Sequence, residues 1–174
     1  MVEKIRSAMS RAHGLDLALS QRTCEAVASR VVVAFLRGLS RFGDGALSLT
    51  AAVVLLLGRG PAAAARFAGV ALAGVAIQKT LKALLSRRRP CFVDGGPSQR
   101  APIPDAGSFP SGHTLHAVLA AVTVAAFVPM LAPPFFAVAA LMAWSRVALG
   151  VHYPSDVLAG GALGGLLGAL ACLR

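Results

Sequence analysis

The chain has 174 residues, of which 56% are hydrophobic and only 14% are charged, whereas soluble domains carry about 25% charged residues. Lys and Arg outnumber Asp and Glu by 17 to 7, giving a formal net charge of +10. Such an excess suits nucleic acid, an anionic membrane surface or a phosphorylated substrate. Here the charges separate long uncharged stretches, and one Trp and one Tyr offer no stacking platform for bases. We therefore expect a membrane protein whose partners do not include nucleic acid.

The three cysteines, Cys24, Cys91 and Cys172, are scattered and have no metal-ligand spacing. We expect them to be small packing residues rather than zinc ligands or a disulfide framework. The first 21 residues contain several charges and no continuous apolar run, which argues against a cleaved signal peptide.

From about Ser20 to Phe42 the sequence is amphipathic. At 100° per residue, Arg30, Arg37 and Arg41 fall on one side and apolar residues fill the opposite side. We expect a helix here that lies in the headgroup region. The other interpretation is a sixth, irregular span packed against the bundle. Residues 40–45 predict a break before the first clear span.

Uncharged runs predict five membrane-spanning helices, at about 45–58, 62–86, 111–131, 135–149 and 156–173. The first run covers roughly 21 Å at 1.5 Å per residue, so it needs flanking residues to cross. Residues 87–110 hold five of the ten prolines, too many for a helix to continue through them. The last span carries two interleaved glycine stripes that favour close helix contacts in lipid, Gly160/Gly164/Gly168 and Gly161/Gly165.

These patterns predict an all-α, polytopic transmembrane helical bundle of about five to six helices, including the N-terminal amphipathic helix. The length fits a single membrane-embedded domain, 1–174, with an interfacial segment at 1–42 and a core at 43–174. Helix two leaves the membrane where helix three re-enters it, and helix four leaves where helix five re-enters. The loop at 87–110 and the turn at 150–155 must therefore share one membrane face.

Two cations close the second predicted helix. On a continuous helix Lys82 and Arg89 would share a face two turns apart, but Pro90 disfavours helical geometry at Arg89 and predicts a helix end there. Arg offers bidentate contacts to phosphate oxygens and Lys a point charge. The alternative interpretation is a basic cluster that binds lipid headgroups or sets topology.

The third predicted helix begins at Pro110-Ser111-Gly112-His113. Exposed backbone N–H groups and the positive end of the dipole make such a helix start an anion site. His113, in the first turn, is placed to give a proton to a leaving oxygen. The alternative is a capped helix start with an incidental histidine. We expect His116 to be a packing residue or to support its neighbours.

The third polar segment runs from Ser145 to Asp156. Arg146 ends a span, where an arginine is costly unless it faces a polar cavity. His152 and Asp156 are four residues apart across a helix turn begun by proline. The carboxylate can therefore orient one imidazole nitrogen and leave the other for substrate, and only this histidine is backed by an acid.

The motifs Lys82-x6-Arg89-Pro, Pro-Ser111-Gly112-His113 and Ser-Arg146-x5-His152-x3-Asp156, in this order and spacing, resemble the three signatures of the type 2 phosphatidic acid phosphatase family. The resemblance implies a membrane lipid phosphatase with no metal cofactor. It implies that His152 attacks phosphorus and forms a phosphohistidine, that Asp156 orients it, and that His113 protonates the leaving group. The residues it implies for binding the phosphoryl oxygens are Lys82, Arg89, Ser111, Gly112 and Arg146.

Two other functions share part of this pattern. A non-enzymatic membrane protein could bind anionic headgroups through its arginines, and vanadium-dependent haloperoxidases share the signatures but are soluble and much larger. Polyprenyl diphosphate, phosphatidylglycerophosphate and phosphatidate all remain candidate substrates. The positive-inside rule places the basic N-terminal segment in the cytoplasm. The resemblance implies a bacterial inner membrane and an active site that faces the periplasm or exterior.

Overall fold

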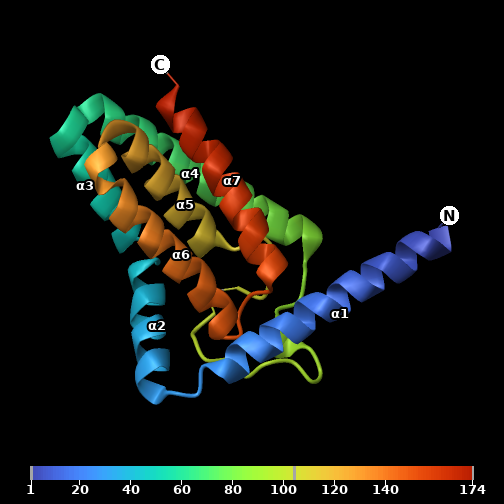
Figure 1. Ribbon diagram of the computed structural model, residues 1–174. Coiled ribbons are helices and arrows are strands. Elements are labelled where there is room, and N and C mark those ends of the chain that lie inside the picture. Colours follow the sequence, from blue (N-terminus) through green and yellow to red (C-terminus); the bar gives the residue numbers. More distant parts are fainter. Residues whose placement is uncertain (1, 104, 174) are drawn as a thin grey trace.

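The computed structural model describes residues 2–103 and 105–173, with side chains from residue 12 onward, so Pro104 of the polar loop lies outside the described residues. Apart from one isolated bridge between Arg88 and Gly107, regular structure in this part is helical, which confirms the all-α prediction (Figure 1). Its α-helices are α1 (Val2–Ala26), α2 (Arg30–Phe42), α3 (Ala46–Arg59), α4 (Pro61–Leu85), α5 (Gly112–Phe127), α6 (Ala132–Ala148) and α7 (Pro154–Cys172). Two 3-10 turns, η1 (Pro90–Phe92) and η2 (Pro129–Leu131), complete the order.

Helices α3 to α7 form the bundle, and α5 lies at its centre in contact with α3, α4, α6 and α7. Leu115, Leu119 and Val124 of α5 are fully buried. Within the described residues, three helical segments are long and apolar enough to cross a membrane: Pro61–Leu85, Pro129–Ala148 and Pro154–Cys172. Helices α2 and α3 pass the same test as one span bent by 55°. The central α5 is apolar but shorter, at 16 residues.

The amphipathic segment at 20–42 is not one helix, so that part of the prediction was wrong. Helix α1 ends at Ala26, and α2 starts only at Arg30. Ser29 caps α2, because its hydroxyl accepts the Val32 N–H at 3.5 Å. A serine side chain at such a position accepts from the first N–H groups of a new helix, which favours a new helix start over continuation of the preceding helix. The chain bends there, so α1 runs across one end of the bundle and α2 leads into α3 (Figure 1).

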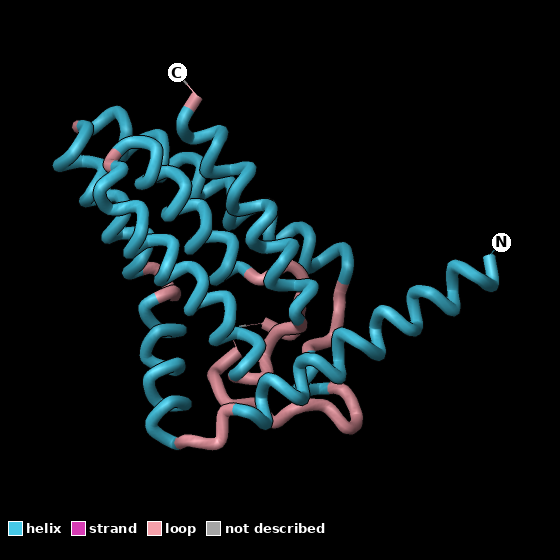
Figure 2. Tube along the Cα trace, viewed as in Figure 1, coloured by secondary structure: helices cyan, strands magenta, loops and turns pink. Residues whose placement is uncertain are grey.

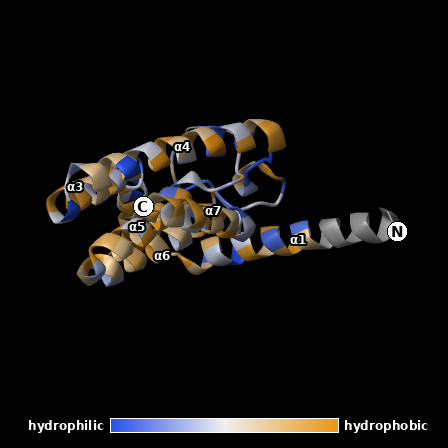
Figure 3. Cartoon of the chain, turned by 90° about the horizontal axis from the view of Figure 1, so that it is seen from above, coloured by the Kyte–Doolittle hydropathy of each residue, from blue (hydrophilic) through white to orange (hydrophobic). Residues whose placement is uncertain are grey.

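Both polar segments gather at one end of the bundle, as the count of spans predicted (Figure 2). The Arg100 N–H donates to the carbonyl of Leu149 at 3.0 Å, and Arg89 donates to the carbonyl of Val151 at 2.9 Å. Hydrophilic residues concentrate in these loops, whereas the bundle helices are mostly hydrophobic (Figure 3). Charged side chains are therefore concentrated at the end where the loop and the turn meet.

One of the two glycine stripes on α7 makes the predicted close contact. A Cβ on Gly160 would lie 2.4 Å from the carbonyl oxygen of Ser111, and one on Gly164 would lie 2.3 Å from that of Leu115. The other stripe does not pack this way: a Cβ on Gly161 would meet only ordinary contacts at 3.9 Å or more, and nothing lies within 4 Å of one on Gly165. Close approach of α7 to the α5 backbone therefore depends on the first stripe alone.

Gly164→Ala and Gly165→Ala form a matched pair that tests this contact. Gly164→Ala should lower the free energy of unfolding by about 1–3 kcal/mol, because the new methyl pushes α7 from α5. Gly165→Ala should leave it unchanged or raise it, because alanine favours the helix and meets open space. Thermal unfolding of the detergent-purified variants measures both. Equal melting temperatures for the pair would contradict the packing.

Candidate active site

The turn between α6 and α7 presents His152. Gly150 adopts a left-handed φ of 73°, and a Cβ there would lie 2.5 Å from the carbonyl oxygen of Ser98, so only glycine fits between the turn and the polar loop. The Arg146 carbonyl then accepts the N–H groups of Val151 and His152, both at 3.2 Å. These bonds tie the turn to the last turn of α6 and fix where His152 lies.

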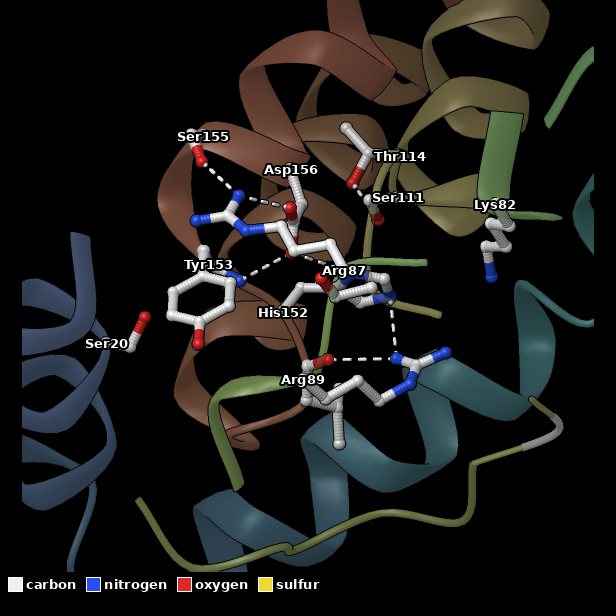
Figure 4. A network of polar contacts seen from close by, with 12 residues as sticks. Ser20, Lys82, Arg87, Arg89, Ser111, Thr114, His152, Tyr153, Ser155 and Asp156 are labelled. Atoms are coloured by element: carbon white, nitrogen blue, oxygen red, sulfur yellow. Dashed lines mark hydrogen bonds and ion pairs between the residues drawn. The ribbon is translucent and has the colours of Figure 1, made fainter. Parts of the chain in front are cut away.

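His152 lies between an acid and an arginine (Figure 4). Its Nδ1 is 3.4 Å from Asp156 Oδ2, within ion-pair distance but without a hydrogen bond, and its Nε2 is 3.1 Å from Arg89 Nη1. Because a guanidinium can only donate, Nε2 must offer its lone pair and Nδ1 must carry the proton. Burial, with the charges of Arg146 and Arg89, holds the pKa of His152 well below its ordinary value. The neutral imidazole thus keeps a lone pair on Nε2.

Asp105, a loop residue that the sequence did not single out, joins Lys82 to Arg89. Its carboxylate oxygens lie 2.8 and 3.0 Å from Lys82 Nζ, and Oδ1 lies 3.0 Å from Arg89 Nη2. Burial opposes ionisation of Asp105, but its contacts with Lys82 and Arg89 outweigh that and lower its pKa. A carboxylate therefore already bridges two of the cations predicted for phosphate.

The helix ends before Arg89, as Pro90 predicted, so Lys82 and Arg89 do not share a helical face. Helix α4 stops at Leu85, Ser86 adopts a left-handed conformation, and Arg89 is extended. Extended backbone turns alternate residues to opposite sides. The side chain of Arg89 is accordingly buried, that of Arg88 exposed and that of Arg87 intermediate. The two cations are joined through the carboxylate of Asp105, not through a helix register.

The start of α5 is tied to the start of α7. Ser111 is buried, its N–H donates to the Asp156 carbonyl at 3.0 Å, and its hydroxyl lies 3.0 Å from that of Thr114. A Cβ on Gly112 would lie 1.8 Å from the amide oxygen of Gln78, so no larger residue fits there without displacing that side chain. The two segments that carry the histidines are thus held together by a direct backbone bond.

His113 also faces a carboxylate, contrary to the expectation that only His152 has one. Its Nε2 lies 2.8 Å from Oδ1 of Asp44, within ion-pair distance but without a hydrogen bond. Asp44 comes from the break between α2 and α3, which brings the N-terminal third of the chain to the site. Nothing in the spacing of the motifs points to this residue.

Arg146 is buried at the end of α6, with 1% of its surface exposed. Its Nη1 donates to the hydroxyl of Ser40 on α2. Its Nε is buried and has no hydrogen-bond partner among the described residues. Such a donor is costly unless something accepts from it. The predicted polar cavity explains why an arginine is tolerated here.

That cavity has a volume of about 590 Å³ and two kinds of wall. Six of the eight predicted site residues line its polar end: Lys82, Arg89, Gly112, His113, Arg146 and His152. Ser111 and Asp156 are buried beside it. Away from the polar end, α3 and α4 supply an apolar wall that includes Leu49, Ala52, Phe67, Ala71, Leu72 and Val75. His116 lines the cavity too, with a buried Nε2 that lacks a partner among the described residues.

Within the described residues, no three or more His, Cys, Asp or Glu side chains are grouped so as to hold a metal ion. The site is instead built from cations and histidines around a cavity. This donor set suits an anion with several oxygens, such as a phosphoryl group.

A helical bundle with this cationic, histidine-bearing end defines a membrane phosphatase. The family model of the PAP2 superfamily matches residues 63–173, and the chain belongs to that superfamily. It is an integral membrane phosphatase, as the resemblance of its motifs implied.

Relatives of known name support the class. The chain is 37% identical over 152 residues to decaprenylphosphoryl-5-phosphoribose phosphatase of Mycobacterium tuberculosis, covering 80% of this chain and 78% of the relative. It is also 37% identical over 113 residues to lipid A 1-phosphatase of Rhizobium etli, covering 62% and 47%.

Two solved structures share the fold. The PAP2-type phosphatidylglycerolphosphate phosphatase of Bacillus subtilis superposes with a TM-score of 0.75 at 25% identity, covering 92% of this chain and 84% of that one. LpxE of Aquifex aeolicus gives a TM-score of 0.78 at 22% identity, covering 90% and 94%.

Proposed function

We propose that this phosphatase hydrolyses a phosphomonoester or diphosphate of a lipid through a phosphohistidine on His152, without a metal. The observation that carries the proposal is the placement of His152. Its Nε2 holds a lone pair next to Arg89, its Nδ1 side faces Asp156, and it lines the same cavity as His113. A nucleophile, an orienting acid and a second histidine thus surround one anion site.

In the first step the lone pair of His152 Nε2 forms a bond to phosphorus, and the bond from phosphorus to the leaving oxygen breaks. His113 gives that oxygen a proton. Asp156 stabilises the positive charge that the imidazole gains. In the second step His113 takes a proton from water, the water oxygen bonds to phosphorus, and the phosphorus–nitrogen bond breaks. Inorganic phosphate leaves, and Nε2 regains its lone pair.

The cations stabilise the charge on the phosphoryl oxygens as the transition state forms. Lys82, Arg89 and Arg146 supply the charge, and Ser111 and Gly112 supply the helix start. Asp105 pairs with both Lys82 and Arg89, so the substrate phosphate must exchange with its carboxylate. A phosphoryl group carries more charge and more oxygens than a carboxylate and can contact all three cations at once.

The shape of the cavity supports a lipid substrate. Its polar end can hold the phosphate, and the apolar wall of α3 and α4 can hold part of a hydrocarbon tail. Because a relative that aligns over most of both chains is named for a decaprenylphosphoryl substrate, we place polyprenyl-linked phosphates first. Phosphatidylglycerophosphate and phosphatidate are the competing substrates.

Phosphate release in neutral detergent micelles with a chelator tests the function. The wild type should release phosphate from at least one of polyprenyl diphosphate, phosphatidylglycerophosphate and phosphatidate. His152→Ala should lower release by at least about 10³-fold, because the nucleophile is lost, while headgroup binding persists. If the wild type binds these lipids without releasing phosphate, the protein is a headgroup binder. Activity that survives in His152→Ala would show that the nucleophile is another group.

We also propose an orientation in the membrane. It is the one that the family resemblance favours: a bacterial inner membrane and a site that faces the periplasm or exterior. The charges argue for the opposite orientation. Arg22 on α1 and Arg88 and Arg100 in the polar loop lie at the loop end, whereas Arg59 and Arg66 contact the other end. By the positive-inside rule the more basic end faces the cytoplasm.

Two single-cysteine variants separate these orientations. Asp94→Cys places an exposed thiol at the loop end, and Met130→Cys places one at the opposite end. Both are made in a chain whose three natural cysteines are replaced. With a membrane-impermeant maleimide on intact cells, labelling of Asp94→Cys alone supports the outward-facing site. Labelling of Met130→Cys alone overturns it and places the site in the cytoplasm.

A further inference from the structure

One face of α1 packs against the catalytic turn. Asp16, Ser20 and Cys24 recur every four residues, and their side chains are buried or nearly so, with 11% of the Asp16 side chain exposed. The cysteine thiol contacts the Ser98 carbonyl in the polar loop. Residues on the other side of the helix, such as Leu15 and Arg22, are exposed. This segment carries none of the phosphatase motifs, yet its buried face lies at the site.

Asp16 binds the start of α7. Its Oδ1 accepts the Ser155 N–H at 3.1 Å, and its Oδ2 accepts the hydroxyl of the same serine. The first N–H groups of a helix have no partner within the helix and carry partial positive charge. A carboxylate from α1 thus caps the helix that bears Asp156.

Asp16 also pairs with Arg87, whose Nη2 lies 2.7 Å from Oδ2. Through Nη1, Arg87 donates to the Ser155 hydroxyl and to Asp156 Oδ1, both at 2.7 Å (Figure 4). Its guanidinium lies over the ring of Tyr153, 4.0 Å from the centroid, and the His13 ring of α1 lies 5.6 Å from that same ring. Arg87 is therefore held by two carboxylates and one aromatic face.

The two carboxylate oxygens of Asp156 contact different partners. Oδ1 receives Arg87, whereas Oδ2 accepts the Tyr153 N–H at 2.9 Å and faces His152 Nδ1 at 3.4 Å. The carboxylate is fully buried. Without Arg87 it could rotate, and it would lose the cation that neutralises it. Its support of the charge on His152 would then weaken.

We propose that Arg87 and Asp16 are positioning residues that act on His152 through Asp156, which makes α1 part of the working site. This inference rests on the proposed function of His152. Neither residue lines the cavity that receives the phosphate. Their loss should therefore lower kcat and leave KM for the lipid unchanged.

Turnover of Arg87→Gln, Arg87→Lys and Arg88→Gln tests the role of Arg87. Arg87→Gln should lower kcat by about 10- to 100-fold, the range for groups that orient a functional ligand. Arg87→Lys should recover part of it, because an ammonium keeps the charge but cannot bridge both carboxylates or stack on the ring. Arg88→Gln, a change at the exposed neighbour, is the matched control and should turn over like the wild type.

Asp16→Asn tests the link to α1. It should lower kcat less than Arg87→Gln does. The double variant should be no slower than Arg87→Gln alone, because the asparagine amide oxygen can still accept the Ser155 N–H, so that Asp16→Asn removes chiefly the ion pair with Arg87. Three results would overturn the inference. They are additive losses of kcat in the double variant, a rise in KM, and a fall in melting temperature that Arg87→Lys does not reverse. Equal kcat in Arg87→Gln and Arg88→Gln, with His152→Ala inactive, would overturn it and leave the proposed function standing. An inactive wild type would overturn both.

Discussion

Two buried guanidinium groups, those of Arg89 and Arg146, set the conditions that the rest of this structure must meet. Each is about 1% exposed at the end of an apolar bundle, where an unpaired charge is strongly destabilising. The surrounding chain provides oxygen acceptors for both. Arg89 donates to the carbonyls of Asp105 and Val151 and to the Asp105 carboxylate, and Arg146 donates to the Ser40 hydroxyl. Arg146 still keeps a donor without a partner among the described residues. A bound phosphoryl group would meet that remaining need.

The same constraint explains why distant segments converge. Ser40 and Asp44 reach the site because the chain bends between α2 and α3, and Asp105 reaches it because the loop folds back on α4. The glycines of α7 allow α5 to approach closely, and the bond from the Ser111 N–H to the Asp156 carbonyl aligns the two histidine-bearing helix starts. Packing of the bundle and charge compensation thus act on the same few residues.

The predictable part of the protein was the part encoded in local pattern. Uncharged runs predicted the bundle helices, and fixed spacing within short motifs predicted residues such as Lys82, His113 and His152 that line one cavity. Their partners could not be predicted in this way. Asp44 and Asp105 lie in loops whose path depends on tertiary contacts, and Arg87 is distinguished from Arg88 only by the extended backbone after Ser86. The break at Ser29 was hidden because amphipathic periodicity continues across it.

We propose above all that Nε2 of His152 receives the phosphoryl group while Nδ1 is kept for Asp156. The most direct test is ³¹P NMR, with peptide mapping, of the enzyme quenched during turnover of a lipid phosphate. The geometry predicts a phosphohistidine at residue 152 that is substituted on Nε2. A phosphoryl group on Nδ1, on His113 or on any other residue would contradict it.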